Sequence, residues 1–350
     1  MIAAADPYLS LIIAARNDNY AGGMLRRLQV CVDSFVHQVE AAALPSELIL
    51  VDWNPPPDRP LRTALKWPAS PRSSTIRLIT VPPAVHARQR FGDRLPIIIH
   101  RARNVGVRRA RGTFILPTSA DILFSDELIA TFAMRRLDPA AIYRIVRHDV
   151  PEAVLELDSH DARLSYCREH VMQVHGDERS YRIPGAPPLF TNAAGDFTLM
   201  SRELYARLRG IPEEHEFHSV HLDSVFCYQA HAAGAIQQIF VEPCRMYHVD
   251  HGVPSWRRRA GMLERLAARL PLTPKTSKRL VKKIRKRFPP RSPIDRLGVP
   301  YLTKSTPAGK AHYEGFIRQI LEARGGFVYN TQDWGLGNET LDEELIAVAR

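Results

Sequence analysis

The first half of the chain alternates short apolar runs with amphipathic segments, and this pattern restricts the fold more than any other feature. Apolar runs predict buried strands at 8–15, 47–53, 75–81 and 113–117. Apolar residues at helical spacing predict helices at 24–40 and 97–111. Strand–helix–strand alternation produces parallel strands joined by right-handed crossovers. The sequence therefore predicts an α/β fold with a mostly parallel sheet flanked by helices.

The pattern is looser after residue 137. We expect further strands at 141–147, 235–241 and 245–249, and helices beginning near Arg202 and over 219–233. The polar stretch 150–182 carries no clear period. At Pro254 the composition changes abruptly, and we place a domain boundary there.

The formal net charge is +11, and its meaning depends on where the charge lies. Residues 254–291 contain fourteen Lys or Arg and one acid, a net +13, so the other 312 residues sum to −2. A generally basic chain would suggest nucleic acid or an anionic surface. A nearly neutral domain with a basic appendage argues against a nucleic-acid-binding protein.

Within the basic segment, residues 275–288 place apolar side chains on one side of a predicted helix and Lys or Arg on the others. One interpretation is a solvated helix packed on the rest of the protein. Another is peripheral contact with anionic lipid headgroups. Nucleic acid ranks last because no aromatic residues are interleaved for stacking. The four scattered cysteines and the lack of a signal-like or membrane-spanning run favour a cytoplasmic protein, with contact to the inner face of the membrane through 275–288.

Polar residues follow three of the predicted strands. They are Ala15-Arg16-Asn17 after the first, Asp52 at the end of the second, and Ser119 to Asp121 after the fourth. Carboxyl ends of parallel strands meet at one sheet edge, where ligands bind. A single Asp after a strand is usually a turn or cap residue. Ser125 and Asp126 suit the cap of the next helix, which leaves Asp121 for a hard divalent cation such as Mg²⁺ or Mn²⁺.

Six segments in order resemble the GT-A fold glycosyltransferases, particularly the inverting nucleotide-sugar-dependent family 2 type. They are LSLIIAARND, ELILVDWN, ARNVGVRRARGTFILPTSAD (102–121), AAGDFTLMSRELYARLRGIPE, HLDSVFCYQAHAAG and YHVDH. The resemblance covers 8–251, about 70% of the chain. It implies a Rossmann-like GT-A catalytic domain over 1–253, with a nucleotide-sugar half (about 1–125) and an acceptor half (about 126–253). A basic helical and Pro-rich extension with an acidic tail follows over 254–350.

The resemblance also assigns donor-binding residues. Asp52 would recognise the nucleotide base, and Ala15, Arg16 and Asn17 would line the same pocket. Arg103 and Asn104 would lie against the ribose and phosphates. Ser119 stands where the family has the first Asp of its metal-binding motif, so one carboxylate is missing from the donor and metal site.

Further resemblance-based roles concern the metal and the chemistry. Asp121 matches the second Asp of the metal motif, and His248 and His251 fall where the family places a histidine near the metal or diphosphate. Asp223 matches the acid that acts as general base; the alternative is a surface or capping acid of its helix. Asp196 either approaches the acceptor or anomeric carbon or stabilises a turn.

The implied function is a bacterial-type, hexosyltransferase-like enzyme using Mn²⁺ or Mg²⁺. It would move a sugar from a UDP- or GDP-type nucleotide sugar to a hydroxyl of a saccharide, lipid-linked or protein acceptor, with inversion. An alternative is a non-catalytic, degenerate GT-A domain that binds a nucleotide or acts as a scaffold recruited to polyanions or membrane. Ser119, and Leu222 where the family has Glu, favour that alternative. A retaining transferase with Asp196 near the anomeric carbon is a third.

Overall fold

The computed structural model describes residues 6–68, 71–213, 218–219, 221–251, 301–302, 307–323 and 327–347. The basic segment 254–291, the predicted helix at 275–288 and the boundary at Pro254 lie outside these residues. Among the described helices, none combines the length and apolar character that crossing a bilayer requires.

A six-stranded sheet forms the centre of the protein, in the order β14-β3-β2-β1-β4-β9. Its inner strands β3, β2, β1 and β4 are parallel, and the two outer strands are antiparallel to their neighbours. The predicted α/β class with a mostly parallel sheet is confirmed. The strand bounds are β1 Leu9–Ala15, β2 Ser46–Trp53, β3 Ser74–Val81, β4 Phe114–Thr118, β9 Met200–Ser201 and β14 Asp342–Ala347.

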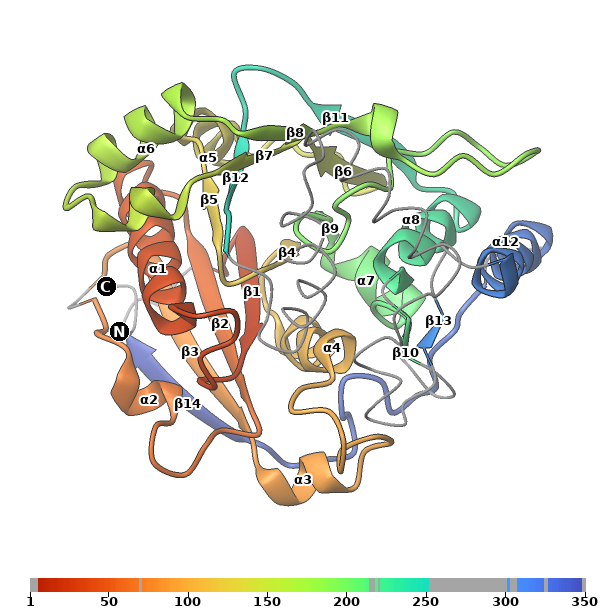
Figure 1. Cartoon of the computed structure of the whole chain (residues 1–350), viewed down its shortest axis with the longest axis horizontal. Coiled ribbons are helices and arrows are strands. Elements are labelled where there is room, and N and C mark those ends of the chain that lie inside the picture. Colours follow the sequence, from red (N-terminus) through yellow and green to blue (C-terminus); the bar gives the residue numbers. More distant parts are fainter. Residues whose placement is uncertain are drawn as a thin grey trace, which may run out of the picture.

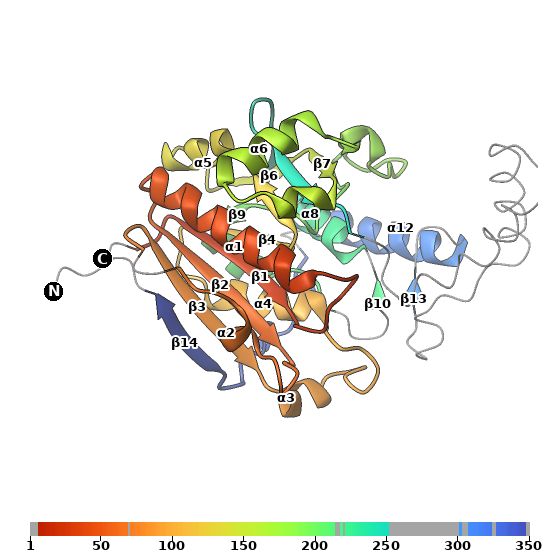
Figure 2. The same cartoon turned by 60° about the vertical axis from the view of Figure 1, so that its left-hand side comes forward.

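Helices cover both faces of this sheet (Figures 1 and 2). On one face, Leu11 and Ile13 of β1 pack in a core with residues of α1 (Met24–Ala41). On the other face, Ile12 packs in a core with Ala102 of α4 (Ile99–Arg109). Successive side chains of a strand point to opposite faces, so a strand covered on both faces is expected to be apolar at most positions. This explains why β1 is apolar at every position except Ser10, which is buried and donates to Glu47.

The second half of the domain adds two smaller sheets. A four-stranded sheet has the order β5-β12-β7-β8, and a two-stranded one pairs β6 with β11. The predicted strand at 141–147 is in fact two strands, β6 and β7, that join different sheets. The bounds are β5 Ile122–Phe124, β6 Ala141–Ile145, β7 Arg147–Val150, β8 Gln173–His175, β11 Ile236–Phe240 and β12 Met246–Val249.

The remaining elements connect these sheets or pack on them. The unassigned stretch 150–182 contains α6 and β8. The other helices are α2 Leu61–Ala64, α3 Pro83–Ala87, α5 Asp126–Ala133, α6 His160–Glu169, α7 Arg202–Leu208 and α8 Leu222–Ala232. Short elements are the 3₁₀ turns Glu152–Glu156 and Asp177–Arg179, and the paired strands β10 His218–Ser219 and β13 Tyr301–Leu302.

The described C-terminal residues pack on the same body. Helix α12 (Pro307–Glu322) buries Ile317 and Ile320 beside α8. Trp334 is buried beneath the guanidinium of Arg108, whose carbon lies 5.2 Å from the ring centre. The acidic tail forms the edge strand β14, where Glu343 pairs with Arg77 at 2.7 Å. A strand that covers β3 in this way protects the sheet edge from pairing with other chains.

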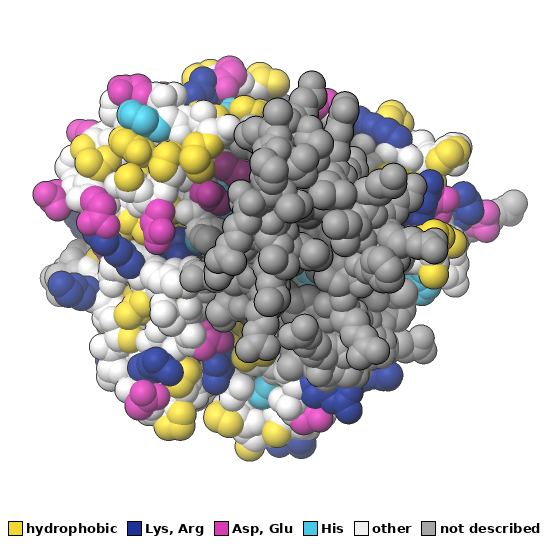
Figure 3. Space-filling view, in the orientation of Figure 1, with side chains coloured by type: hydrophobic (Ala, Val, Ile, Leu, Met, Phe, Trp, Pro, Cys, Tyr) yellow, Lys and Arg dark blue, Asp and Glu magenta, His cyan; other side chains and the backbone are white. Residues whose placement is uncertain are grey.

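Acidic and basic side chains are interspersed on the visible face of the described residues (Figure 3). This mixture agrees with a nearly neutral domain.

Candidate functional site

The strand order changes direction beside β1, since β2 and β3 extend to one side of it and β4 lies on the other. Ligands of open α/β sheets bind beyond the carboxyl ends of the strands at such a switch point. Arg16 and Asn17 follow β1 there, and Ser119 and Asp121 follow β4. The structure therefore brings these predicted residues to one edge.

Asp52 ends β2 and pairs across the sheet with Ala15. Its Oδ2 accepts a hydrogen bond from the Leu61 backbone N–H at 2.8 Å. Its Oδ1 is buried and has no hydrogen-bond partner among the described residues. Burial raises the pKa of Asp52 to about 6, although the Leu61 N–H and the charge of Arg16 oppose that shift. One acceptor atom of this carboxylate is thus unsatisfied within the described part of the chain.

Arg16 and Asn17 join the loops that follow β1 and β2. Arg16 Nε donates to the Asn54 carbonyl at 2.7 Å, and Asn17 Nδ2 donates to the Arg59 carbonyl at 2.9 Å. Together with Ala15 they surround the end of β2 that carries Asp52.

Asn104, another of the predicted donor residues, lies apart from this group. Its side chain is completely buried, and its amide donates to the Ile211 carbonyl at 2.7 Å and to Glu213 at 3.0 Å. Its Oδ1 accepts from the Ile211 N–H at 2.9 Å. The amide therefore stabilises the turn that follows α7.

Asp121, His248 and His251 come together at the start of β5. Because β12 is antiparallel to β5, His248 pairs with Ile122, the residue that follows Asp121. One ligand atom from each of the three side chains lies within 4.8 Å of the others. Asp121 Oδ2 is 3.1 Å from His251 Nε2 and 3.8 Å from His248 Nε2.

This group fits a divalent cation. Asp121 Oδ1 is buried without a hydrogen-bond partner among the described residues, so it has an unused lone pair. One carboxylate and two imidazoles are ligands that first-row transition ions accept. The cap assigned to the following helix is also present, because the Leu128 N–H bonds to Ser125 Oγ at 3.3 Å and leaves Asp121 outside the cap.

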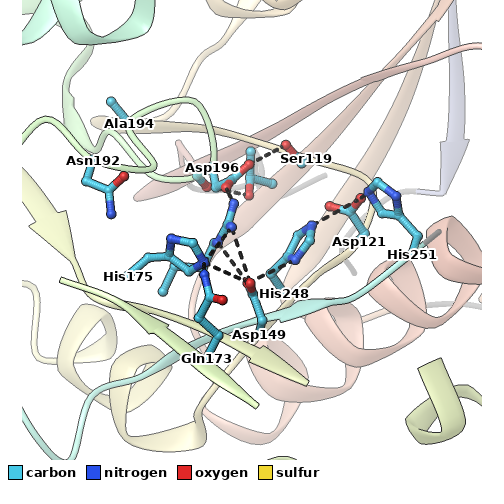
Figure 4. Close-up of polar contacts among 12 residues, drawn as sticks. Ser119, Asp121, Asp149, Gln173, His175, Asn192, Ala194, Asp196, His248 and His251 are labelled. Atoms are coloured by element: carbon cyan, nitrogen blue, oxygen red, sulfur yellow. Dashed lines mark hydrogen bonds and ion pairs between the residues drawn. The ribbon is translucent and has the colours of Figure 1, made fainter. Parts of the chain in front are cut away.

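The prediction missed Asp149, which lies at the centre of the polar site (Figure 4). Its carboxylate accepts from His248 Nδ1 at 3.1 Å and His175 Nε2 at 2.8 Å, and it lies 3.0 Å from Arg147 Nε. Burial alone would raise the pKa of Asp149, but these cationic and hydrogen-bonding neighbours lower it to about 2. Arg147 and Asp149 are partly exposed and alternate with buried His148 and Val150. In the sequence, two charged residues spaced by two were the only sign that they share one face of a strand.

Asp196 forms hydrogen bonds both to Arg147, a neighbour of Asp149, and to Ser119, which follows β4. Its Oδ2 accepts from Arg147 Nη1 at 2.7 Å, and its Oδ1 accepts from Ser119 Oγ at 2.7 Å. Ser119 Oγ in turn accepts from Arg103 Nη2 at 3.0 Å. Burial would raise the pKa of Asp196, but the charges of Arg147 and His248 outweigh it and hold the pKa below its ordinary value.

Asp223 lies in the first turn of α8 and reaches the same region. A Cβ placed on Gly195 would lie 3.0 Å from Asp223 Oδ2 and 3.2 Å from Arg103 Nη1. Glycine therefore lets the loop backbone run close to both side chains. The carboxylate of Asp223 and the guanidinium of Arg103 meet beside the residue that precedes Asp196.

Arg144, which the sequence-based prediction also missed, binds the backbone of the loop that carries Gly195 and Asp196. It is completely buried and donates to the carbonyls of Phe190 at 3.2 Å and Asn192 at 2.7 Å, and to Thr198 Oγ1 at 3.1 Å. Burial lowers the pKa of the Arg144 guanidinium, and the nearby negative charges of Asp223 and Asp196 act against that shift.

No family model matches the chain, and no curated protein matches it. Among solved structures, residues 1–349 of S. aureus TarS are similar to it, with 14% identity, 78% of this chain and 69% of that chain covered, and a TM-score of 0.42. The same TarS fragment in complex with UDP-GlcNAc has 13% identity, 78% and 70% coverage and a TM-score of 0.41. A longer TarS structure has 13% identity, 77% and 41% coverage and a TM-score of 0.38. This chain thus spans less than half of the longer TarS structure.

Proposed function

We propose that this chain is a glycosyltransferase that moves a sugar from a UDP- or GDP-type nucleotide sugar to an acceptor hydroxyl, with inversion. One observation carries the proposal. A divalent-cation ligand set (Asp121, His248, His251) and a separate carboxylate (Asp223) converge beyond the carboxyl ends of the central strands. Inverting transfer from a nucleoside diphosphate can use both, the base on the acceptor side of the reacting carbon and the cation on the leaving-group side.

In the proposed reaction the acceptor oxygen forms a bond to the anomeric carbon while the bond to the diphosphate oxygen breaks. Asp223 takes the proton of the acceptor hydroxyl, a contribution of about 10²–10⁴-fold to the rate. Asp121, His248 and His251 would hold Mn²⁺ or Mg²⁺, which when bound supplies Lewis acidity for the leaving diphosphate. Asp52 accepts a hydrogen bond from the base, and Arg103 contributes positive charge near the phosphates.

The inverting assignment is supported by the bonds of Asp196. Both of its oxygens are engaged, one by Arg147 and one by Ser119, which argues against a nucleophile attacking the anomeric carbon. The anomeric configuration of the product distinguishes inversion from retention.

The test is turnover of a panel of nucleotide sugars with and without Mn²⁺. Asp223→Asn should lower turnover by about 10²–10⁴-fold while nucleotide binding persists. Asp161→Asn is the matched control, because Asp161 is an exposed first-turn acid of α6. Absence of turnover in the unmodified protein, with nucleotide binding intact, would favour the non-catalytic alternative that Ser119 suggests.

We also propose a cytoplasmic protein that contacts the membrane through residues 275–288. Deletion of residues 254–291 should abolish binding to vesicles containing anionic lipid. Equal binding by the full and shortened chains would contradict this role.

A further inference from the structure

His248 is held from two sides. Its Nε2 faces Asp121 and its Nδ1 faces Asp149, at 3.8 Å and 3.1 Å respectively. Figure 4 shows the ring between the two carboxylates, with His251 on the Asp121 side. The Asp149 contact therefore leaves the cation-facing nitrogen open.

We propose that Asp149 is a positioning residue for the candidate cation site, which fixes the ring of His248 with its proton on Nδ1 and the lone pair of Nε2 directed toward Asp121. This inference rests on the cation-dependent function proposed above. A neutral imidazole has one N–H and one lone pair, and a carboxylate can only accept. The bond to Asp149 therefore requires the proton on Nδ1 and leaves Nε2 basic. A carboxylate behind a ligating histidine fixes ring orientation and tautomer.

Asp149 is itself firmly held, as a positioning residue must be. Register pairs it with His248 on β12 and with Gln173 on β8. Arg147 lies two residues before it on the same face of β7 and is anchored at its other end to Asp196. His175 bonds it from β8. Three strands thus fix the carboxylate before any ligand arrives.

The experiment measures Mn²⁺ affinity on the full chain by electron paramagnetic resonance of free Mn²⁺. Asp149→Asn should weaken binding by about 10- to 100-fold. His248→Ala removes the ligand itself. Since Asp149 acts only through His248, adding Asp149→Asn to His248→Ala should cause no further loss.

Asp126→Asn is the matched control. Asp126 also bonds a histidine, His160 Nε2 at 2.9 Å, but at the start of α5 outside the site. This variant should bind Mn²⁺ as the unmodified protein does.

Several results would overturn the inference. If Asp149→Asn binds Mn²⁺ normally, or weakens binding equally in the His248→Ala background, Asp149 does not act through His248. If the unmodified protein binds no Mn²⁺, the proposed cation site fails, and this inference fails with it.

A readout without substitution covers the case in which the variants do not fold. Nitrogen-15 shifts of histidine in the cation-free protein, at a pH where His248 is neutral, should show the Nδ1–H tautomer. The Nε2–H tautomer would refute the assignment.

Discussion

Asp52 offers the sharpest test of the proposed donor pocket, because its carboxyl group is buried and only one of its two oxygens has a hydrogen-bond partner among the described residues. The side chain is 1% exposed, one oxygen bonds the Leu61 N–H, and the other has no partner among the described residues. Burial raises its pKa from 3.8 to about 6. A shift of about two pKa units corresponds to about 3 kcal/mol of differential interaction between the two protonation states.

The sign of the pH dependence follows from this shift. Below about pH 4 the carboxyl group is protonated in both the folded and the unfolded chain. Between about pH 4 and pH 6 the unfolded chain releases the proton while the folded protein keeps it, so the free energy of unfolding falls. Above the folded pKa the loss is complete and no longer changes with pH. Asp52 thus costs stability at neutral pH, as expected of a group that awaits a ligand.

The substitution Asp52→Asn removes this titration. Relative to the variant, the unmodified protein should lose about 2–3 kcal/mol of unfolding free energy between pH 4 and pH 8. Urea unfolding at both pH values measures this difference. Asp58→Asn is the control, because Asp58 lies in the same loop region with a side chain 75% exposed. The same pH dependence in the unmodified protein and Asp52→Asn would refute the argument, since it would mean that burial does not suppress ionisation.

Three further predictions address the loop, the tail and the end of β4. Gly195→Ala should lower turnover about tenfold, because the new Cβ displaces Asp223 and Arg103. Gly315→Ala, in open space on α12, should leave turnover unchanged, and an equal loss in both variants would contradict this reasoning. Glu343→Gln should cost about 1–2 kcal/mol in urea unfolding, because it weakens the contact to Arg109 and removes one of the two carboxylates paired with Arg77, the other being Glu47. Glu344→Gln, whose partner Arg62 is exposed, should cost no more than about 0.5 kcal/mol. Equal changes in unfolding free energy for Glu343→Gln and Glu344→Gln would show that the burial of Arg77 and Arg109 does not strengthen their ion pairs. Ser119→Asp places a second carboxylate against Asp196 and should lower the melting temperature. Adding Asp196→Ser to this variant should restore the melting temperature. If it does not, direct repulsion between the two carboxylates is not the cause.

The central sheet was predictable because its strands are buried on both faces. Every residue of β1 and β2 is buried, and both strands are mainly apolar, with the exceptions Ser10 in β1 and Ser46, Glu47 and Asp52 in β2. The edge strand β14 was not predictable in the same way, since three of its first four residues are acidic. Its position depends on Arg77 and Arg109, which lie far away in the sequence.

Neighbouring residues of one motif can serve different parts of the fold. Arg103 and Asn104 are adjacent on α4, and the resemblance assigned both to the donor. Successive residues of a helix point about 100° apart. Arg103 reaches Ser119, whereas Asn104 points to the turn after α7. The motif alone does not show that Arg103 faces the site and that Asn104 faces the turn.

The aspartates of the site show why its electrostatics could not be deduced from the chain alone. Burial acts on Asp52, Asp149 and Asp196 in the same direction, since removing a carboxylate from water raises its pKa. The outcomes differ because Arg147 and His248 lie beside Asp149 and Asp196, whereas the effect of burial on the pKa of Asp52 is opposed only by the Leu61 N–H and the charge of Arg16. Arg147 and His248 stand on β7 and β12, about a hundred residues apart, and sheet pairing brings them together. Strand register therefore brings together the charges that lower the pKa of Asp149 and Asp196. An Asp149 variant should disturb His248 more than a substitution at a sequence neighbour of His248 that leaves the register intact.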